Sequence, residues 1–263
     1  MSSVVDIHWV ILALFFSTLT APLALSRYYR LKIEKELIIS VLRMTLQLIL
    51  VGAYLEYLLK INNLFINMAW LTAMILIGAS SIVSKAKLPK SKILLPVTTG
   101  LFFGLLPLIA LICLLIIKPT PLYNAQYLIP LSGMLLGNSL SGNIVALQNL
   151  FTSLEQRKDE YEAAISLGAS PQYASLPFVR EALQKSLAPS LASMSTTGLV
   201  TLPGMMTGQI LSGSSPLIAI KYQLMIMVAI FVMLSISIAI TLSLSIRNCI
   251  NSNGLVMARM GNK

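Results

Sequence analysis

The chain has 263 residues, of which 56% are hydrophobic and only 11% charged, whereas soluble globular domains carry about 25% charged residues. This composition excludes an ordinary soluble domain and predicts an integral membrane protein. The net charge of +10 does not indicate nucleic-acid binding, because the basic residues form short clusters between apolar segments and no continuous basic face. Membrane orientation and contact with anionic lipid explain these clusters better.

Apolar segments of the length that a membrane requires recur along the whole chain. A bilayer core needs about 20 mostly apolar helical residues. We therefore expect an all-α, polytopic membrane protein, a single transmembrane domain over residues 1–263 with about seven transmembrane helices. The expected spans are 8–26, 37–59, 64–84, 93–117, 127–151, 183–203 and 217–246. The N-terminus has no basic region followed by a small-residue cleavage site, so the first segment is expected to be retained.

Basic residues alternate between the links. The links after the first, third and fifth spans are basic, whereas the second and fourth carry Lys60 and Lys118 and the sixth carries no cation. The positive-inside rule predicts that the basic links and the C-terminus, with Arg247, Arg259 and Lys263, are cytoplasmic and that the N-terminus lies outside. The basic links contain Arg27, Arg30, Lys32 and Lys35; Lys85, Lys87, Lys90 and Lys92; and Arg157, Lys158, Arg180 and Lys185.

The second span carries polar residues on one helical stripe. Arg43, Gln47 and Tyr54 are separated by four and seven residues, a spacing that places them on the same face. Arg43 and Gln47 are candidates for the translocation pathway, although Arg43 can also reach the cytoplasmic interface or make a structural interhelical bond. Glu56 is the one carboxylate in an expected span, and it faces either a pore entrance or solvent at the rim.

Glycines four residues apart mark the fourth and fifth spans. Gly100 and Gly104 in the fourth, and Gly133 and Gly137 in the fifth, predict close helix packing in lipid. The polar run 138–143 that follows is more polar than packing requires. We expect this part of the fifth span to face protein or a water-filled path.

The polar stretch 154–182 predicts a bent helical elbow. Acidic residues at 159–162 suit the first turn of a helix, and Gly168 can end that helix in the left-handed conformation. Ser170 can cap a second helix that begins at Pro171. Beyond it, Pro177 and Pro189 predict a kinked amphipathic helix along the inner surface that turns into the sixth span.

Small residues on the elbow suggest a docking surface. Ala163 and Ala164 would allow close backbone approach, and Glu162 adds one charge at the edge. Glu-Ala-Ala followed after three residues by Gly168 resembles the EAA loop of ABC transporter permeases, the cytoplasmic coupling helix that sits in a groove of an ATPase subunit. That resemblance implies ATPase-coupling residues Glu162, Ala163, Ala164, Gly168, Ser170 and Pro171. An ordinary amphipathic connector is the alternative.

The segment 201–216 has no charge and breaks the helical pattern with glycines and prolines. Non-helical backbone at membrane depth is tolerated only against protein or a water-filled cavity. We expect a discontinuous or re-entrant element that lines the outer pathway, with a plain external hairpin as the alternative. The pathway candidates from here are Pro203, Gly204, Met205, Met206, Thr207, Gly208 and Gln209, to which Gln223 is added.

A family resemblance covers essentially the whole chain. The runs that carry it are Glu162-Ala-Ala, Gly168-Ala-Ser-Pro, Val179-Arg-Glu-Ala182, Thr197-Gly-Leu-Val200, Leu202-Pro-Gly-Met-Met-Thr-Gly-Gln-Ile210, Ser215-Pro216 and Lys221-Tyr-Gln223. They resemble the FetB family, described as iron-export ABC permeases and related to plant half-transporters linked to aluminium tolerance. The resemblance implies a permease homodimer in the cytoplasmic membrane and a separate FetA-type ATP-binding subunit.

The chemistry expected of this chain is transport. It has no GxxxxGK[ST] phosphate loop, so no enzymatic activity or cofactor is expected here, and ATP and Mg would be used by the partner. Carboxylates are scarce in the spans, so Met205 and Met206 are the candidate metal ligands, with gap-filling between helices as the alternative. An ion-coupled secondary transporter and a permease for a small organic solute stay open.

Overall fold

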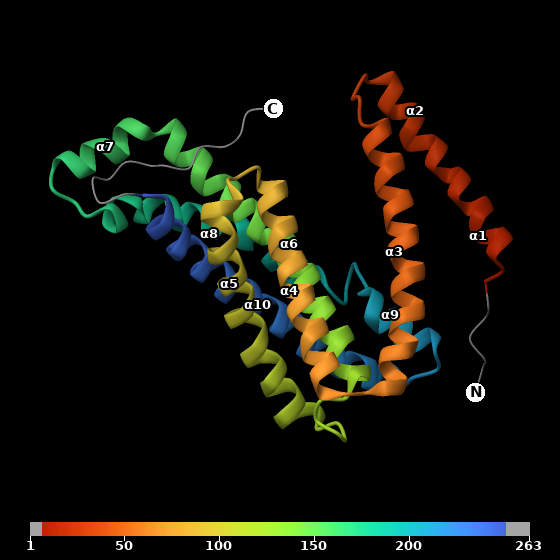
Figure 1. Cartoon of the computed structure of the whole chain (residues 1–263). Coiled ribbons are helices and arrows are strands. Elements are labelled where there is room, and N and C mark those ends of the chain that lie inside the picture. The colour runs from red at the N-terminus through yellow and green to blue at the C-terminus, as the bar shows by residue number, and fades with distance from the viewer. Residues whose placement is uncertain (1–6, 251–263) are drawn as a thin grey trace.

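The computed structural model describes residues 7–250, and every regular element among them is helical (Figure 1), which confirms the all-α prediction. A 3-10 helix, η1, and a π-helix, η2, interrupt or extend the α-helices. The elements are α1 Trp9–Phe15, η1 Phe16–Leu19, α2 Thr20–Tyr28, α3 Glu34–Ile61, α4 Leu64–Ala86, α5 Lys90–Leu111, η2 Ile112–Ile117, α6 Ala125–Gln156, α7 Lys158–Ser166, α8 Pro171–Thr196, α9 Gly204–Leu211 and α10 Pro216–Cys249.

Within residues 7–250, six helical stretches are long and apolar enough to cross a membrane, where the sequence predicted seven. They are Trp9–Tyr28, Glu34–Ile61, Leu64–Ala86, Lys90–Ile117, Ala125–Gln156 and Pro216–Cys249. The expected span 183–203 is different, because α8 begins at Pro171 and ends at Thr196 with both Pro177 and Pro189 inside it. This helix is long enough but carries too many charged and hydroxyl residues, and residues 197–203 after it are not helical.

The core of the molecule is the contact between α5 and α10. A Cβ atom built on Gly100 would lie 2.6 Å from the Ser237 carbonyl oxygen, and one on Gly104 would lie 3.1 Å from the Met233 carbonyl oxygen. Only glycine therefore lets the two backbones approach so closely. The close packing expected from the glycines of the fourth span is confirmed.

In α6 the close approach occurs at a different glycine from those expected. A Cβ atom on Gly137 would meet nothing within 4 Å, and one on Gly133 would touch only the end of a methionine side chain. At Gly142, by contrast, a Cβ atom would lie 2.5 Å from Leu234 Cδ1 of α10. Since α6 faces α10 at Gly142, the pair at 133 and 137 is free to line another surface.

A buried polar contact joins α6 to α10 beside that glycine. The Asn143 side-chain nitrogen donates to Ser237 Oγ at 2.9 Å and to the Ser139 carbonyl oxygen at 2.9 Å. All three residues are buried, so this part of the polar run faces protein. Because a buried amide is costly without partners, the bonds favour one alignment of the two helices.

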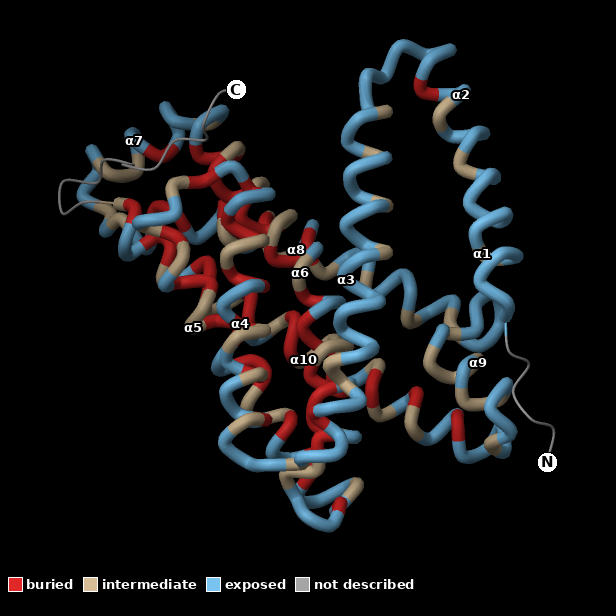
Figure 2. Tube along the Cα trace, turned by 45° about the vertical axis from the view of Figure 1, so that its right-hand side comes forward, coloured by how far each residue is buried: buried red, intermediate tan, exposed pale blue. Residues whose placement is uncertain are grey.

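The first three helices lie apart from this bundle, and almost all of their residues are exposed (Figure 2). Leu58 is the one buried residue of α3, and it packs with Ala125 and Ile129 in a small second core. At the α3–α4 turn, Asn62 Oδ1 accepts a hydrogen bond from the Ala125 backbone nitrogen at 2.9 Å. The N-terminal hairpin is therefore joined to the bundle at the C-terminal end of α3.

The links alternate between two ends of the molecule in Figure 1. Links 29–33 and 87–89 lie at the end that carries α7, whereas links 62–63 and 118–124 lie at the opposite end. The links with basic clusters therefore share one end, as the charge pattern predicts. The C-terminal cations Arg259 and Lys263 lie outside the described residues.

The close α5–α10 contact predicts that a glycine-to-alanine change lowers protein stability at Gly100 but not at Gly137. Gly100→Ala should lower stability by about 1–3 kcal/mol, because the new Cβ must displace the α10 backbone. Gly137→Ala is the matched control and should be neutral or slightly stabilising, since alanine favours helix and the position is open. Thermal unfolding of the two purified variants measures the difference, and equal midpoints would contradict the packing argument.

Candidate functional site

The predicted elbow is present, and its local signals act as expected. Gly168 has φ +89°, and its backbone nitrogen donates to the Ile165 carbonyl oxygen at 2.9 Å at the end of α7. Ser170 Oγ accepts from the Tyr173 backbone nitrogen at 3.3 Å, and Pro171 is the first residue of α8. A glycine stop and a capped restart therefore turn the chain sharply between α7 and α8.

The outward face of the elbow is small and partly apolar. Glu162 and Ala163 are exposed, whereas Ala164 is half-buried and packs against the main core. Leu167 is 89% exposed and Tyr173 is 73% exposed, so both side chains offer apolar surface on the elbow. Sequence reasoning did not select these two residues, although a leucine directly before the glycine stop is a recognisable signal.

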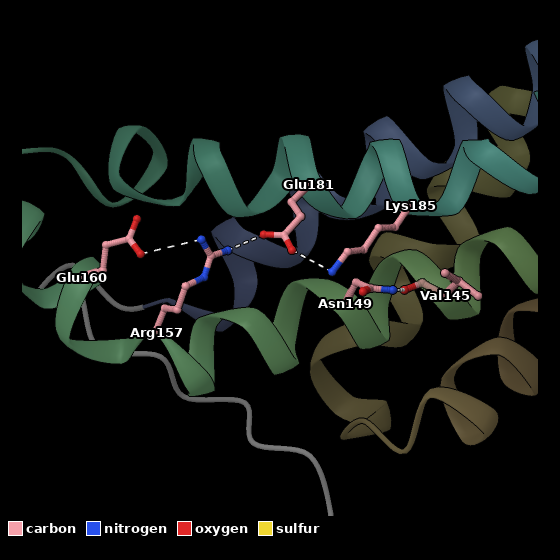
Figure 3. Close-up of polar contacts among 6 residues, drawn as sticks. All are labelled: Val145, Asn149, Arg157, Glu160, Glu181 and Lys185. Carbon is pink, nitrogen blue, oxygen red and sulfur yellow. Dashed lines mark hydrogen bonds and ion pairs between the residues drawn. The ribbon is translucent and has the colours of Figure 1, made fainter.

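A cluster around Arg157 fastens the elbow to α8 (Figure 3). The Arg157 guanidinium pairs with the Glu181 carboxylate, and it lies 3.7 Å from Glu160 Oε2. Its central carbon is 4.6 Å from the Phe178 ring centroid, and Lys185 Nζ lies 2.7 Å from Glu181 Oε1. One arginine at the end of α6 thus holds both α7 and α8.

An aromatic contact supports the same junction. Tyr161 of α7 is only 2% exposed, and its ring packs edge-to-face on Phe178 of α8 with centroids 6.4 Å apart. Glu181 is half-buried on α8, and its carboxylate is paired twice. The Arg157–Glu181 pair joins residues that lie 24 positions apart in the sequence. Helical spacing alone does not predict such a contact.

The charges around Glu181 lower the pKa of its carboxyl group. The hydrogen bond from Lys185 is the largest cause, the charges of Lys185 and Arg157 act in the same direction, and partial burial opposes them. The carboxylate therefore stays ionised, and able to pair with Arg157, to a lower pH than an isolated glutamate.

A cavity of about 420 Å³ lies among α6, α8, α9 and α10. None of its lining residues is charged, and they combine thioether, amide and hydroxyl groups with aliphatic side chains. A smaller cavity beside it shares Asn138, Ser193 and Met227 and adds Met194. The main cavity is lined by Met134, Asn138, Ser193, Thr197, Thr201, Pro203, Gly204, Met205, Gln223, Ile226, Met227 and Ile230.

Gln223 gives this cavity its most specific feature. The residue is 7% exposed, and its Oε1 atom has no hydrogen-bond partner in the part of the chain that the structure describes. An unpaired buried acceptor is costly unless something else binds it. Because Met134, Met205 and Met227 also line this cavity, it combines soft thioether and neutral amide donor groups.

Only some of the predicted pathway residues line the methionine-lined cavity. Pro203, Gly204, Met205 and Gln223 line the cavity, whereas four residues of α9 that were selected are not among the lining residues: Met206, Thr207, Gly208 and Gln209. The expected break is present, since α9 is a short helix between the non-helical residues 197–203 and the turn at Gly213.

Sequence reasoning missed Met134 and Met227. Each lies four residues from a polar residue that was noticed, Asn138 or Gln223, and so shares its helical face. The four-residue spacing could have indicated that these methionines lie beside the polar residues. It did not identify the two methionines because every helix here contains several apolar residues at the same spacing.

The candidates of the second span lie elsewhere. Arg43 and Gln47 line a different cavity beside α3, and Tyr54 packs on Trp70 with ring centroids 4.6 Å apart. Glu56 is exposed and lies 2.8 Å from Lys60 Nζ in an i, i+4 ion pair, which fits a rim charge. The structure does not bring these residues to the methionine-lined cavity.

Hard metal ligands do not gather anywhere in residues 7–250. No group of three or more His, Cys, Asp or Glu side chains in that range is arranged to hold a metal ion. Among the described residues, the neutral donors that line the cavity remain the candidate metal ligands.

Comparison with known proteins identifies the relatives of this chain. A model of the uncharacterised protein family UPF0014 matches residues 9–250. The UPF0014 membrane protein slr1647 of Synechocystis sp. is 34% identical over 86% of this chain and 87% of its own length. The Protein ALUMINUM SENSITIVE 3 of Arabidopsis thaliana is 33% identical over 84% of this chain and 83% of its own length.

A further relative has a name that describes transport. The probable iron export permease protein FetB of Escherichia coli is 31% identical over 82% of each chain. No solved structure matches the sequence. The family model, the extent of these alignments and the six apolar helices agree, and the chain belongs to the UPF0014 family of membrane proteins.

Proposed function

We propose that this chain is the permease subunit of an ABC transporter that exports iron or another metal ion across the cytoplasmic membrane. A separate FetA-type subunit would bind ATP and Mg and dock on the elbow, and two permease chains would form the transport unit. The elbow and the basic links would then face the cytoplasm, and the N-terminus would lie outside. Iron as the cargo is supported by similarity to FetB of Escherichia coli.

One observation carries the proposal: α8 links the elbow to the cavity. Its N-terminal part holds Phe178 and Glu181, which bind α7 through Tyr161 and Arg157. Ser193, near its other end, lines the methionine-lined cavity. At 1.5 Å per residue, 26 residues span about 39 Å. Both regions therefore contain residues of one continuous helix, and a movement of the elbow would reach the cavity wall through α8.

The exposed face of the elbow suits a protein partner. Leu167 and Tyr173 offer apolar surface outside the six apolar helices. Ala163, also exposed on the elbow, has a small side chain that allows a partner to approach closely. Such a patch is typical of a docking site for another protein. Because α7 is held by an ion pair and an aromatic contact, docking would move α7 and α8 together.

Docking is tested by co-purification with the ATP-binding subunit. Gly168→Val should abolish association, since valine is strained at φ +89°, and Glu162→Lys should weaken it by reversing the charge at the edge. Glu56→Lys is the matched control, because Glu56 lies at the opposite end and is also exposed. If a nucleotide-binding subunit binds and tolerates both elbow changes, the coupling assignment fails.

The Arg157–Glu181 ion pair should make the contribution of the elbow junction to protein stability depend on pH. Because the pKa of Glu181 is lower in the folded protein, its stabilising contribution is present above the ordinary carboxyl pKa and is lost as pH falls through the lowered value. Thermal unfolding should show Glu181→Gln less stable than the parent protein at pH 7, with the difference shrinking as pH falls below the ordinary carboxyl range. A difference that is independent of pH would contradict this.

The cavity is tested by metal flux in proteoliposomes that hold both subunits. Met205→Leu should lower flux by about tenfold, equivalent to about 1.4 kcal/mol of cargo binding, with the ATPase subunit still bound. Met206→Leu is the control, because Met206 is the neighbour that does not line the cavity. Equal flux from both variants would remove Met205 from the pathway, and flux of an organic solute alone would replace the metal as cargo.

A further inference from the structure

A strongly cationic cavity lies between α3 and the C-terminal end of α4. Its volume is about 720 Å³, and it is larger than the methionine-lined cavity. The two helices meet at the 62–63 turn and diverge toward the end that carries α7 (Figure 1). The lining residues are Lys32, Lys35, Glu36, Ile39, Ser40, Arg43, Met44, Gln47, Leu48 and Lys85.

The cations of this cavity form no ion pair with any residue that the structure describes. Lys32, Lys35, Arg43 and Lys85 make no side-chain ion pair or hydrogen bond within residues 7–250, whose ion pairs all involve other residues. Glu36 is the single acidic lining residue. Four positive charges and one negative leave a formal excess of three positive charges around one cavity.

Arg43 extends the positive charges of this cavity along α3, and its side chain is exposed. It lies nine residues after Glu34, or about 13 Å along α3, inside a stretch apolar enough to cross a membrane. An arginine in such a stretch extends its side chain to the membrane interface or pairs with an opposite charge. Because none comes from the described protein, an anionic ligand is the physically simple partner.

An apolar cavity adjoins the cationic one. It lies between the N-terminal helices and α3, has a volume of about 680 Å³, and shares Met44 and Leu48 with the cationic cavity. It has no charged lining residue. The lining is Trp9, Leu12, Ala13, Phe16, Met44, Thr45, Leu48, Ile49 and Gly52.

We propose that the two adjoining cavities bind one acidic phospholipid. Its phosphate lies among Arg43, Lys35 and Lys85, and an acyl chain fills the apolar cavity beyond Met44 and Leu48. Arginine and lysine bind phosphate through charge-assisted hydrogen bonds, and the adjoining apolar wall favours a lipid over a free phosphate. The proposal does not depend on what the chain transports.

The bound lipid would also have a structural role. Leu58 is the one buried residue of α3, so few protein contacts join the N-terminal hairpin to the bundle. A phosphate that bridges Arg43 of α3 to Lys85 of α4 adds a connection at the diverging end. Acidic lipid should therefore stabilise the hairpin more than the bundle.

The test uses the full chain in nanodiscs of phosphatidylcholine with a small fraction of phosphatidylglycerol. Retained lipid is counted by native mass spectrometry, and thermal unfolding is measured in parallel. The double variant Arg43→Gln/Lys85→Gln should bind phosphatidylglycerol about 30-fold more weakly. The control Lys60→Gln/Lys118→Gln removes two charges at the opposite end and should bind it normally.

A second variant tests the acyl part without removing charge. Gly52 lines the apolar cavity and has open space around its Cβ position, so Gly52→Leu should fill the cavity and weaken phosphatidylglycerol binding without disturbing the fold. Equal retention of phosphatidylcholine, or normal phosphatidylglycerol binding by the double variant, would overturn the proposal. Displacement of the lipid by millimolar inorganic phosphate would assign the site to a free anion instead.

Discussion

The close approach of α5 to α10 is the constraint on which the rest of this structure depends. Gly100 and Gly104 bring the two backbones together, and the Asn143–Ser237 hydrogen bond then aligns α6 on the same helix. Lipid offers no hydrophobic driving force between helices, so association relies on such close packing and polar contacts. The orientation of α10 in turn directs Gln223 and Met227 toward the cavity.

The second organising feature is that α8 belongs to both functional regions. Its first turns are part of the elbow junction, where Arg157 contacts Phe178 and Glu181. Its last turns contribute Ser193 to the cavity. Its high polar content, which keeps it from qualifying as an apolar span, suits a helix that lies against protein at both ends. The elbow junction and the cavity thus share one helix, α8.

The N-terminal hairpin contrasts with this bundle. It is apolar enough to cross a membrane twice, yet the buried core that it shares with the bundle is the small one around Leu58. A charged cavity and an apolar cavity flank α3, so its two faces are chemically different. Such a helix is expected to be stabilised by what surrounds it in the bilayer, whereas α5 and α10 are stabilised by each other.

Sequence alone determined what depends on neighbours along the chain: the helical class, the approximate ends of most helices, and the turn made by Gly168, Ser170 and Pro171. These follow from apolar length, glycine conformation and capping, which are local properties. Only the tertiary structure decided which residues meet. Arg43 does not line the methionine-lined cavity, and Met205 lines it whereas Met206 does not. Arg157 pairs with Glu181. Such contacts depend on how whole helices pack.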